Sequence, residues 1–122
     1  MPEKVNLSEK LALFDDIYKP KIVGELNGQY VKVVKFSGEY VWHRHENEDE
    51  MFLVLDGSMK IHFQDKTVQL DRGEFIIVPR GVEHKPDADA LCQVLLFEPA
   101  ATRNTGNVDH KYTIEADNLE RI

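Results

Sequence analysis

Short apolar segments alternate with polar turns through residues 21–98 of this 122-residue chain. In segment 59–63, Met59, Ile61 and Phe63 share one parity, and polar residues occupy the other. A period of two predicts a strand with one buried face. The predicted strands are 31–36, 40–45, 50–55, 59–63, 67–70, 75–78 and 91–98. Many short strands joined by Gly, Pro and Asp turns favour a closed all-β barrel or sandwich.

The segments on either side of these strands have a different pattern. Residues 6–17 predict a short helix, because Leu7, Leu11 and Phe14 recur at helical spacing and Asn6 or Ser8 can cap it. The sequence around Pro20 ends that helix. Residues 99–122 form a polar tail, in which 111–114 is a candidate strand. We expect the whole chain, 1–122, to form one domain.

Segment 50–55 is apolar on both parities. A strand buried on both faces needs a second covering layer. The sequence leaves two candidates for that layer, the N-terminal helix and a partner subunit.

Composition and charge narrow the range of partners. The net charge is −7, from 22 acidic against 15 basic residues, which disfavours binding to nucleic acid. No apolar run reaches about 18 residues, so no membrane span is predicted, and the polar start predicts no signal peptide. The single cysteine, Cys92, lies in an apolar run, where a small core residue is expected. One cysteine without a partner fits a reducing cytoplasm.

Three histidines and one carboxylate carry the candidate chemistry. On a strand, His43 and His45 project to the same face. Glu50 opens the next strand and returns beside them if the two strands pair, and His84 follows the turn around residues 79–81. Burying these groups in a barrel without a partner is costly. The four residues therefore predict a site for one divalent transition metal, with Ni, Mn, Fe, Zn, Co and Cu all compatible.

Further polar residues near these ligands could assist chemistry. Glu48 and Asp49 are general acid–base candidates in an acidic turn, and Tyr40 is a third, although strand parity points it away from His43. His62 and His110 lack such neighbours in the sequence and are expected to be exposed. Two basic residues flank the second motif and could bind an anionic group at the rim; they are Arg80 and Lys85.

The spacing of these residues resembles the two motifs of the cupin superfamily. The first motif corresponds to Gly38, His43, His45, Glu50 and Gly57, and the second to Gly73, Pro79, Gly81 and His84. The chain departs from the family pattern by a shorter Gly38–His43 spacing and by Ala88, where asparagine is common. The resemblance implies a double-stranded β-helix, or jelly-roll barrel, with His43, His45, Glu50 and His84 as metal ligands.

The chain is also similar to small single-domain bacterial cupins, often labelled mannose-6-phosphate isomerase-like. The similar segments are 24–28 and 97–107. That label reflects fold and does not assign the reaction. The resemblance implies a homodimer, and the doubly apolar segment 50–55 agrees with it.

Several functions suit such a site. A metal-dependent isomerase, epimerase or lyase would polarise a substrate oxygen, and an iron-dependent dioxygenase would activate O₂. A non-catalytic sensing or binding cupin would hold a small ligand, and a metal-free scaffold would use the barrel alone. The acidic turn and the overall charge favour a small polar metabolite that is neutral or singly charged.

Overall fold

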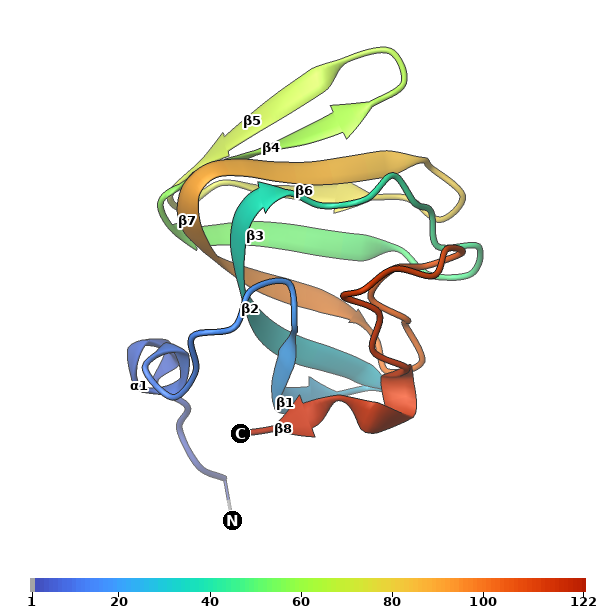
Figure 1. The fold of residues 1–122 in the computed structure, drawn as a ribbon. Coiled ribbons are helices and arrows are strands. Elements are labelled where there is room, and N and C mark those ends of the chain that lie inside the picture. The colour runs from blue at the N-terminus through green and yellow to red at the C-terminus, as the bar shows by residue number, and fades with distance from the viewer. Residues whose placement is uncertain (1) are drawn as a thin grey trace.

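The computed structural model describes residues 2–122 and shows an all-β fold with one short α-helix, as the sequence predicts (Figure 1). The elements in chain order are α1 (Leu7–Leu11), β1 (Lys21–Leu26), β2 (Gln29–Glu39), β3 (Glu50–Asp56), β4 (Ser58–Phe63), β5 (Thr67–Asp71), β6 (Phe75–Val78), β7 (His84–Pro99), a 3₁₀ turn (Ala116–Asn118) and β8 (Glu120–Arg121). No helix in the described part of the chain is long and apolar enough to cross a membrane.

The long strand β7 organises the sheet. Along one edge it pairs with β2 through almost its whole length. Along the other edge it pairs first with β4, through residues 84–87, and then with β3, through residues 93–97. The sheet thus divides into two arms beside β7. Strands β4 and β5 pair to form the β4 arm, and strands β3 and β6 pair to form the β3 arm. The sheet therefore curls around one interior (Figure 1), and the strand pairings among residues 2–122 do not close it into a ring.

That interior holds one hydrophobic core. Every strand from β2 to β7 contributes to it, because alternate side chains of each strand point inward. Ile61 and Met59 of β4 meet Phe52 and Val54 of β3 there, in line with the sequence pattern. The core therefore fixes the register of the strands that carry the predicted site.

The N-terminal helix is shorter than the sequence predicted. It begins at Leu7, capped by the side chain of Asn6, and ends at Leu11 rather than at residue 17. Beyond it the Lys35 ammonium donates a hydrogen bond to the Phe14 carbonyl and lies over the Phe14 ring. These tertiary contacts replace the helical hydrogen bonds of residues 12–17.

Segment 40–45 was predicted as a strand, and that prediction is wrong. Only His43 makes a strand-like contact, as an isolated bridge to His84. The Tyr40 N–H donates to the Pro86 carbonyl instead of joining a regular ladder. Parity arguments therefore do not apply to this segment, and this changes the position of Tyr40.

The C-terminal tail folds back over the end of the interior that holds the histidines. Residues 111–114 do not form the candidate strand; β8 instead pairs in parallel with β1. Asn107 exchanges two hydrogen bonds with the backbone of Arg44. At Gly106, which has φ +56°, an added Cβ would stand 2.2 Å from the Arg44 carbonyl oxygen. Only glycine lets the tail approach the histidine segment this closely.

Candidate metal centre

The structure gathers His43, His45, Glu50 and His84 into one cluster. Their potential ligand atoms all lie within 4.8 Å of one another. Glu50 is the first residue of β3 and His84 the first residue of β7, so the strand ends deliver two of the four. All four side chains are buried, with exposures between 0% and 4%. Within residues 2–122, this is the one His/Cys/Asp/Glu cluster with such geometry.

Backbone contacts orient two of the histidines. The N–H of each of His43 and His84 donates to the carbonyl of the other, at 3.0 Å and 2.9 Å. Their Nδ1 atoms lie 2.8 Å from the Val41 carbonyl and 2.9 Å from the Val82 carbonyl. A carbonyl partner fixes the proton on Nδ1 and leaves Nε2 with its lone pair free. This is the tautomer that a metal ligand requires.

The free atoms in the cluster have no hydrogen-bond partner. The Glu50 Oε1 atom lies 3.2 Å from His45 Nε2 and 3.3 Å from His84 Nε2. All three atoms are buried without a satisfactory hydrogen bond. Buried unpartnered polar atoms carry a desolvation cost that a bound cation would offset. Three imidazoles and one carboxylate suit a divalent transition metal, so the cluster could hold one.

Burial and charge set the protonation of these groups. Burial, with the charge of His84 adding to it, lowers the pKa of His43 to about 4, so this imidazole stays neutral. Burial also opposes charge on His45, but the Glu50 carboxylate outweighs it and the pKa of His45 is raised. The His45 charge, against burial, holds the pKa of Glu50 well below its usual value. A metal ion therefore competes with a proton at His45.

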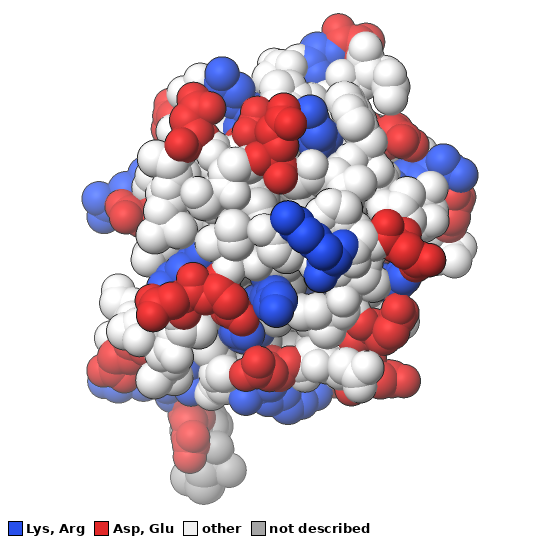
Figure 2. All heavy atoms as spheres, in the orientation of Figure 1, with Lys and Arg blue, Asp and Glu red and all other residues white. Residues whose placement is uncertain are grey.

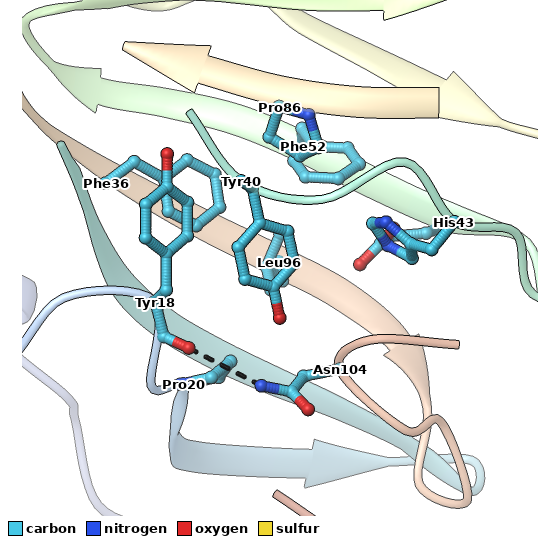
Figure 3. Close-up of a pocket in the computed structure, with 10 residues that line it drawn as sticks. Tyr18, Pro20, Phe36, Tyr40, His43, Phe52, Pro86, Leu96 and Asn104 are labelled. Atoms are coloured by element: carbon cyan, nitrogen blue, oxygen red, sulfur yellow. Dashed lines mark hydrogen bonds between the residues drawn. The ribbon is translucent and has the colours of Figure 1, made fainter. Parts of the chain in front are cut away.

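Tyr40 lies beside the cluster, contrary to the parity argument. Figure 3 shows its ring between Tyr18 and His43, 5.5 Å from the His43 ring centre. Its hydroxyl is buried without a hydrogen-bond partner. Burial, with the charge of Glu50, raises its pKa. Tyr40 is thus a neutral donor at the site, which the sequence pattern did not reveal because segment 40–45 is irregular.

A small cavity adjoins the cluster. It offers about 20 Å³ for the centres of water molecules, which is room for about one water. Its walls are mostly aromatic and aliphatic, with His43, Glu50 and Tyr40 at the polar side; the remaining lining residues are Tyr18, Pro20, Phe36, Phe52, Pro86, Leu96 and Asn104 (Figure 3). This cavity therefore leaves space for a water-sized ligand next to the cluster.

The other polar candidates lie farther out. Glu48 is half-buried and shares a surface hollow with His45 and Arg103 of the tail. Asp49 is exposed and accepts a hydrogen bond from the Arg80 N–H at 2.9 Å. An ion pair with Glu39 likewise holds Lys85, at 3.1 Å. The two basic residues of the rim are therefore paired with acidic neighbours.

The two remaining histidines are outside the cluster. His62 was expected to be exposed, and that prediction is wrong, because the side chain is half-buried. Its ring nitrogens lie 2.9 Å from Thr67 Oγ1 and 3.0 Å from Asp87 Oδ2, on neighbouring strands. His110 is exposed, and its ring centre lies 6.2 Å from that of Tyr40.

Two charged residues that the sequence analysis did not single out lie inside the fold. Lys32 is 0% exposed and Glu98 is 1% exposed, and their Nζ and Oε1 atoms are 2.9 Å apart. Their inward parity, shared with Val34 on β2 and Leu96 on β7, was the available signal. Burial, then the charge of Glu50, raises the pKa of Glu98 to about 8 against the opposing charge of Lys32.

The surface carries mixed charge. On the face shown in Figure 2, acidic and basic side chains are interspersed and the basic ones form no continuous patch. The net charge of the whole chain is −7.

Known proteins match both the sequence and the fold. The family model described as Cupin domain matches residues 31–97. The uncharacterized protein YdbB of Bacillus subtilis (strain 168) is 39% identical over 64 residues, 52% of this chain and 57% of that protein. The match thus covers less than two thirds of that relative.

Two solved structures extend the match over most of the chain. A cupin-2 domain containing protein from Shewanella frigidimarina NCIMB 400 is 40% identical with a TM-score of 0.77, over 78% of this chain and 93% of that chain. Protein NMB1881 from Neisseria meningitidis is 31% identical with a TM-score of 0.74, over 80% of this chain and 99% of that chain. Family model, identity and fold agree, and the chain belongs to the cupin family.

Proposed function

We propose that this cupin binds one divalent transition metal through His43, His45, Glu50 and His84, and uses it to bind or transform a small polar metabolite. The observation that carries the proposal is the set of buried, unpartnered nitrogen and oxygen atoms that converge in the cluster. An all-protein hydrogen-bond network would have satisfied them.

A divalent ion held by four ligands would keep one or two positions for water or substrate and would polarise an oxygen bound there. Around that position the chain supplies a neutral donor, the Tyr40 hydroxyl, and apolar walls that include Phe52 and Leu96. Tyr40 is suited to donate a hydrogen bond to a ligand oxygen. Glu48, in the hollow beside His45, is suited to move a proton at the rim.

The size of the cavity restricts the ligand. With room for about one water, the cavity beside Tyr40 and His43 admits a larger metabolite only if its walls move outward. The acidic surroundings favour a neutral or singly charged molecule. A small polar metabolite that reaches the metal through one oxygen fits these limits.

The test is metal binding by the purified protein. We expect stoichiometric binding of Mn²⁺, Co²⁺ or Ni²⁺ in calorimetry, and a loss of affinity of more than about 100-fold in His84→Ala, since even outer residues of metal sites contribute 10–100-fold. His110→Ala is the matched control, because His110 is exposed and outside the cluster. Failure of every divalent metal to bind the wild-type protein would refute the proposal.

A second experiment separates the possible uses of the metal. Metal-loaded protein is incubated with sugars, sugar phosphates and other small metabolites. Isomerised, epimerised or eliminated products indicate Lewis-acid catalysis, and O₂ uptake by the iron-loaded protein indicates a dioxygenase. A ligand that raises the melting temperature and is recovered unchanged indicates a binding or sensing protein.

We also propose that the protein is a homodimer. On the outer face of the β3 arm, Met51 stands opposite both Ile77 and Phe97, and Leu53 stands opposite both Phe75 and Leu95. Phe75 and Ile77 are 59% and 55% exposed. The helix α1 packs against β2 and leaves this face without a helical cover. A second copy of the same face would bury these side chains.

Light scattering after gel filtration tests the dimer. We expect the mass of a dimer for the wild type and of a monomer for Phe75→Glu. Leu26→Glu, at an apolar position on β1 that is 48% exposed, is the control and should remain dimeric. A monomeric wild-type protein would exclude the proposal.

We further propose a cytoplasmic location, because Cys92 is buried and unpaired as suits a reducing compartment.

A further inference from the structure

Three charged side chains form a row across the interior. The register that pairs Met51 with Phe97 places Glu50 of β3 opposite Glu98 of β7. On the next strand, Lys32 of β2 pairs with Leu96 and reaches diagonally to Glu98. The row therefore runs from Lys32 through Glu98 to Glu50, and Glu50 continues it to the histidine cluster.

The contacts within the row are close and buried from solvent. Lys32 donates a hydrogen bond of 2.9 Å to Glu98 Oε1, and both side chains are at most 1% exposed. Across the β3–β7 pairing, the inward-facing Glu98 stands opposite Glu50. Glu98 Oε2 and Glu50 Oε1 are both buried without a hydrogen-bond partner.

Stability alone does not account for this arrangement. A buried ion pair gains little over apolar residues of similar volume, and carboxyl groups placed directly opposite each other on neighbouring strands repel when both are charged. What the row provides is a buried polar neighbour for Glu50 that Lys32 holds in a fixed position. Residues that hold a metal-ligating carboxylate in this way contribute to the affinity of metal sites.

We infer that Glu98, held in place by Lys32, is a positioning residue that orients the Glu50 carboxylate for metal binding. This inference rests on the proposed metal site and extends it by two residues that do not touch the metal. Lys32 fixes one oxygen of Glu98, so the other faces Glu50. With Glu50 restrained, less conformational freedom is lost when the ion binds.

The experiment compares three variants by titration with Co²⁺ alone. In Lys32→Met/Glu98→Leu, apolar side chains replace the whole pair, so the fold should keep its stability. We expect its Co²⁺ dissociation constant to rise about 10–100-fold. Glu98→Gln keeps the length of the side chain and an acceptor for Lys32, and its amide N–H can donate to Glu50, so it should bind Co²⁺ like the wild type. Met59→Leu, a volume-conserving change in the same core but outside the cavity wall, controls for altered packing and should also bind normally.

A second readout separates positioning from general loosening. The visible absorption bands of bound Co²⁺ report its ligand geometry, and they should change in the double variant and stay unchanged in Glu98→Gln. If the double variant does not fold, Glu98→Asp replaces it, because the shorter side chain keeps the Lys32 partner and withdraws from Glu50. We expect a loss of about tenfold in Co²⁺ affinity there.

The outcomes are distinct. Wild-type affinity and spectrum in the double variant, or in Glu98→Asp if that replaces it, would overturn the inference and leave the proposed function standing. Binding by Glu98→Gln as weak as that of the double variant would also overturn it, because the amide can contact both Lys32 and Glu50. Absence of Co²⁺ binding by the wild type, together with other divalent metals, would refute the proposed function and this inference with it.

Discussion

The two ends of the interior differ in the polarity of their buried side chains. At one end, Val54, Met59, Ile61 and Val94 are apolar and almost fully buried. At the other end, the histidine cluster and Glu98 are equally buried, and they and the half-buried Tyr40 include unpartnered polar atoms. The same strands run through both ends: β3 carries Val54 near one and Glu50 at the other.

The difference separates stability from function along each strand. The apolar end gains free energy from burial alone, at about 25 cal/mol per Å². At the polar end, burial of polar atoms costs desolvation free energy, and hydrogen bonds do not fully offset this cost in the metal-free protein. We therefore expect substitutions at the two ends to have separable effects on folding and on metal affinity, and four predictions test this.

The largest effect is expected at the apolar end. Ile61→Ala should lower the free energy of unfolding by about 2–5 kcal/mol, because it leaves a cavity among fully buried side chains. The Co²⁺ affinity of the folded protein should not change. Ile61→Val should cost about 0.5–1.5 kcal/mol by the same mechanism. Urea unfolding and calorimetry measure the two quantities, and a large loss of metal affinity in Ile61→Ala would show that the ends are not separable.

The second prediction concerns the stability of the metal-free protein in acid. The pKa of His43 falls from 6.5 to about 4 on folding, so the unfolded chain binds more protons between these values. His43 therefore removes stability as the pH falls through this window, by up to about 3 kcal/mol. His45, with its raised pKa, acts in the opposite direction.

The contribution of His43 is isolated by difference. Urea unfolding of the wild type and of His43→Asn between pH 7 and pH 4 should show a steeper acid loss in the wild type. Parallel curves for the two proteins would mean that His43 is not held neutral by its surroundings.

The third prediction concerns the tail that covers the polar end. Gly106→Ala and Gly28→Ala both place alanine at positive φ, at a cost of about 1–2 kcal/mol. Only at Gly106 would the new Cβ meet backbone, the Arg44 carbonyl. Gly106→Ala should therefore lose at least about 1 kcal/mol more and expose the tail to proteolysis. Equal losses and equal proteolysis in the two variants would contradict the close approach of the tail.

The smallest effect is expected for two tyrosines that stack on each other. The Tyr18 hydroxyl donates to the Gly38 carbonyl, whereas the buried Tyr40 hydroxyl has no partner. Tyr18→Phe should cost about 0.5–1.5 kcal/mol in the metal-free protein, and Tyr40→Phe should be neutral or stabilising. Thermal unfolding measures both. A clear loss in Tyr40→Phe would show that its hydroxyl is already satisfied.

The parts of the fold that sequence could predict are those governed by local period and spacing. Alternation identified the strand around Met59 and its inward face, and a short apolar run identified the strand around Phe52. Turn residues and ligand spacing predicted that His43, His45, Glu50 and His84 converge, and the four side chains do form one cluster. These features depend on neighbours in the sequence.

The parts that sequence missed depend on distant contacts. The predicted helix does not continue past Leu11, because Phe14 contacts Lys35 instead. Segment 40–45 makes one isolated bridge to His84 and does not join a strand ladder. The tail reaches the site only because Gly106 fits against Arg44. Lys32 and Glu98 resemble ordinary surface charges until the strand register places them inside.

The reciprocal backbone hydrogen bonds between His43 and His84 have a consequence for assembly. They join the irregular segment before β3 to the start of β7, so they form only after the intervening strands are in place. Contacts between such distant parts of a chain form late in folding, since loop closure must come first. An ion held by the proposed site would therefore enter a finished fold and would not nucleate it. Its identity would follow from affinity order and from the metals that the folded protein meets.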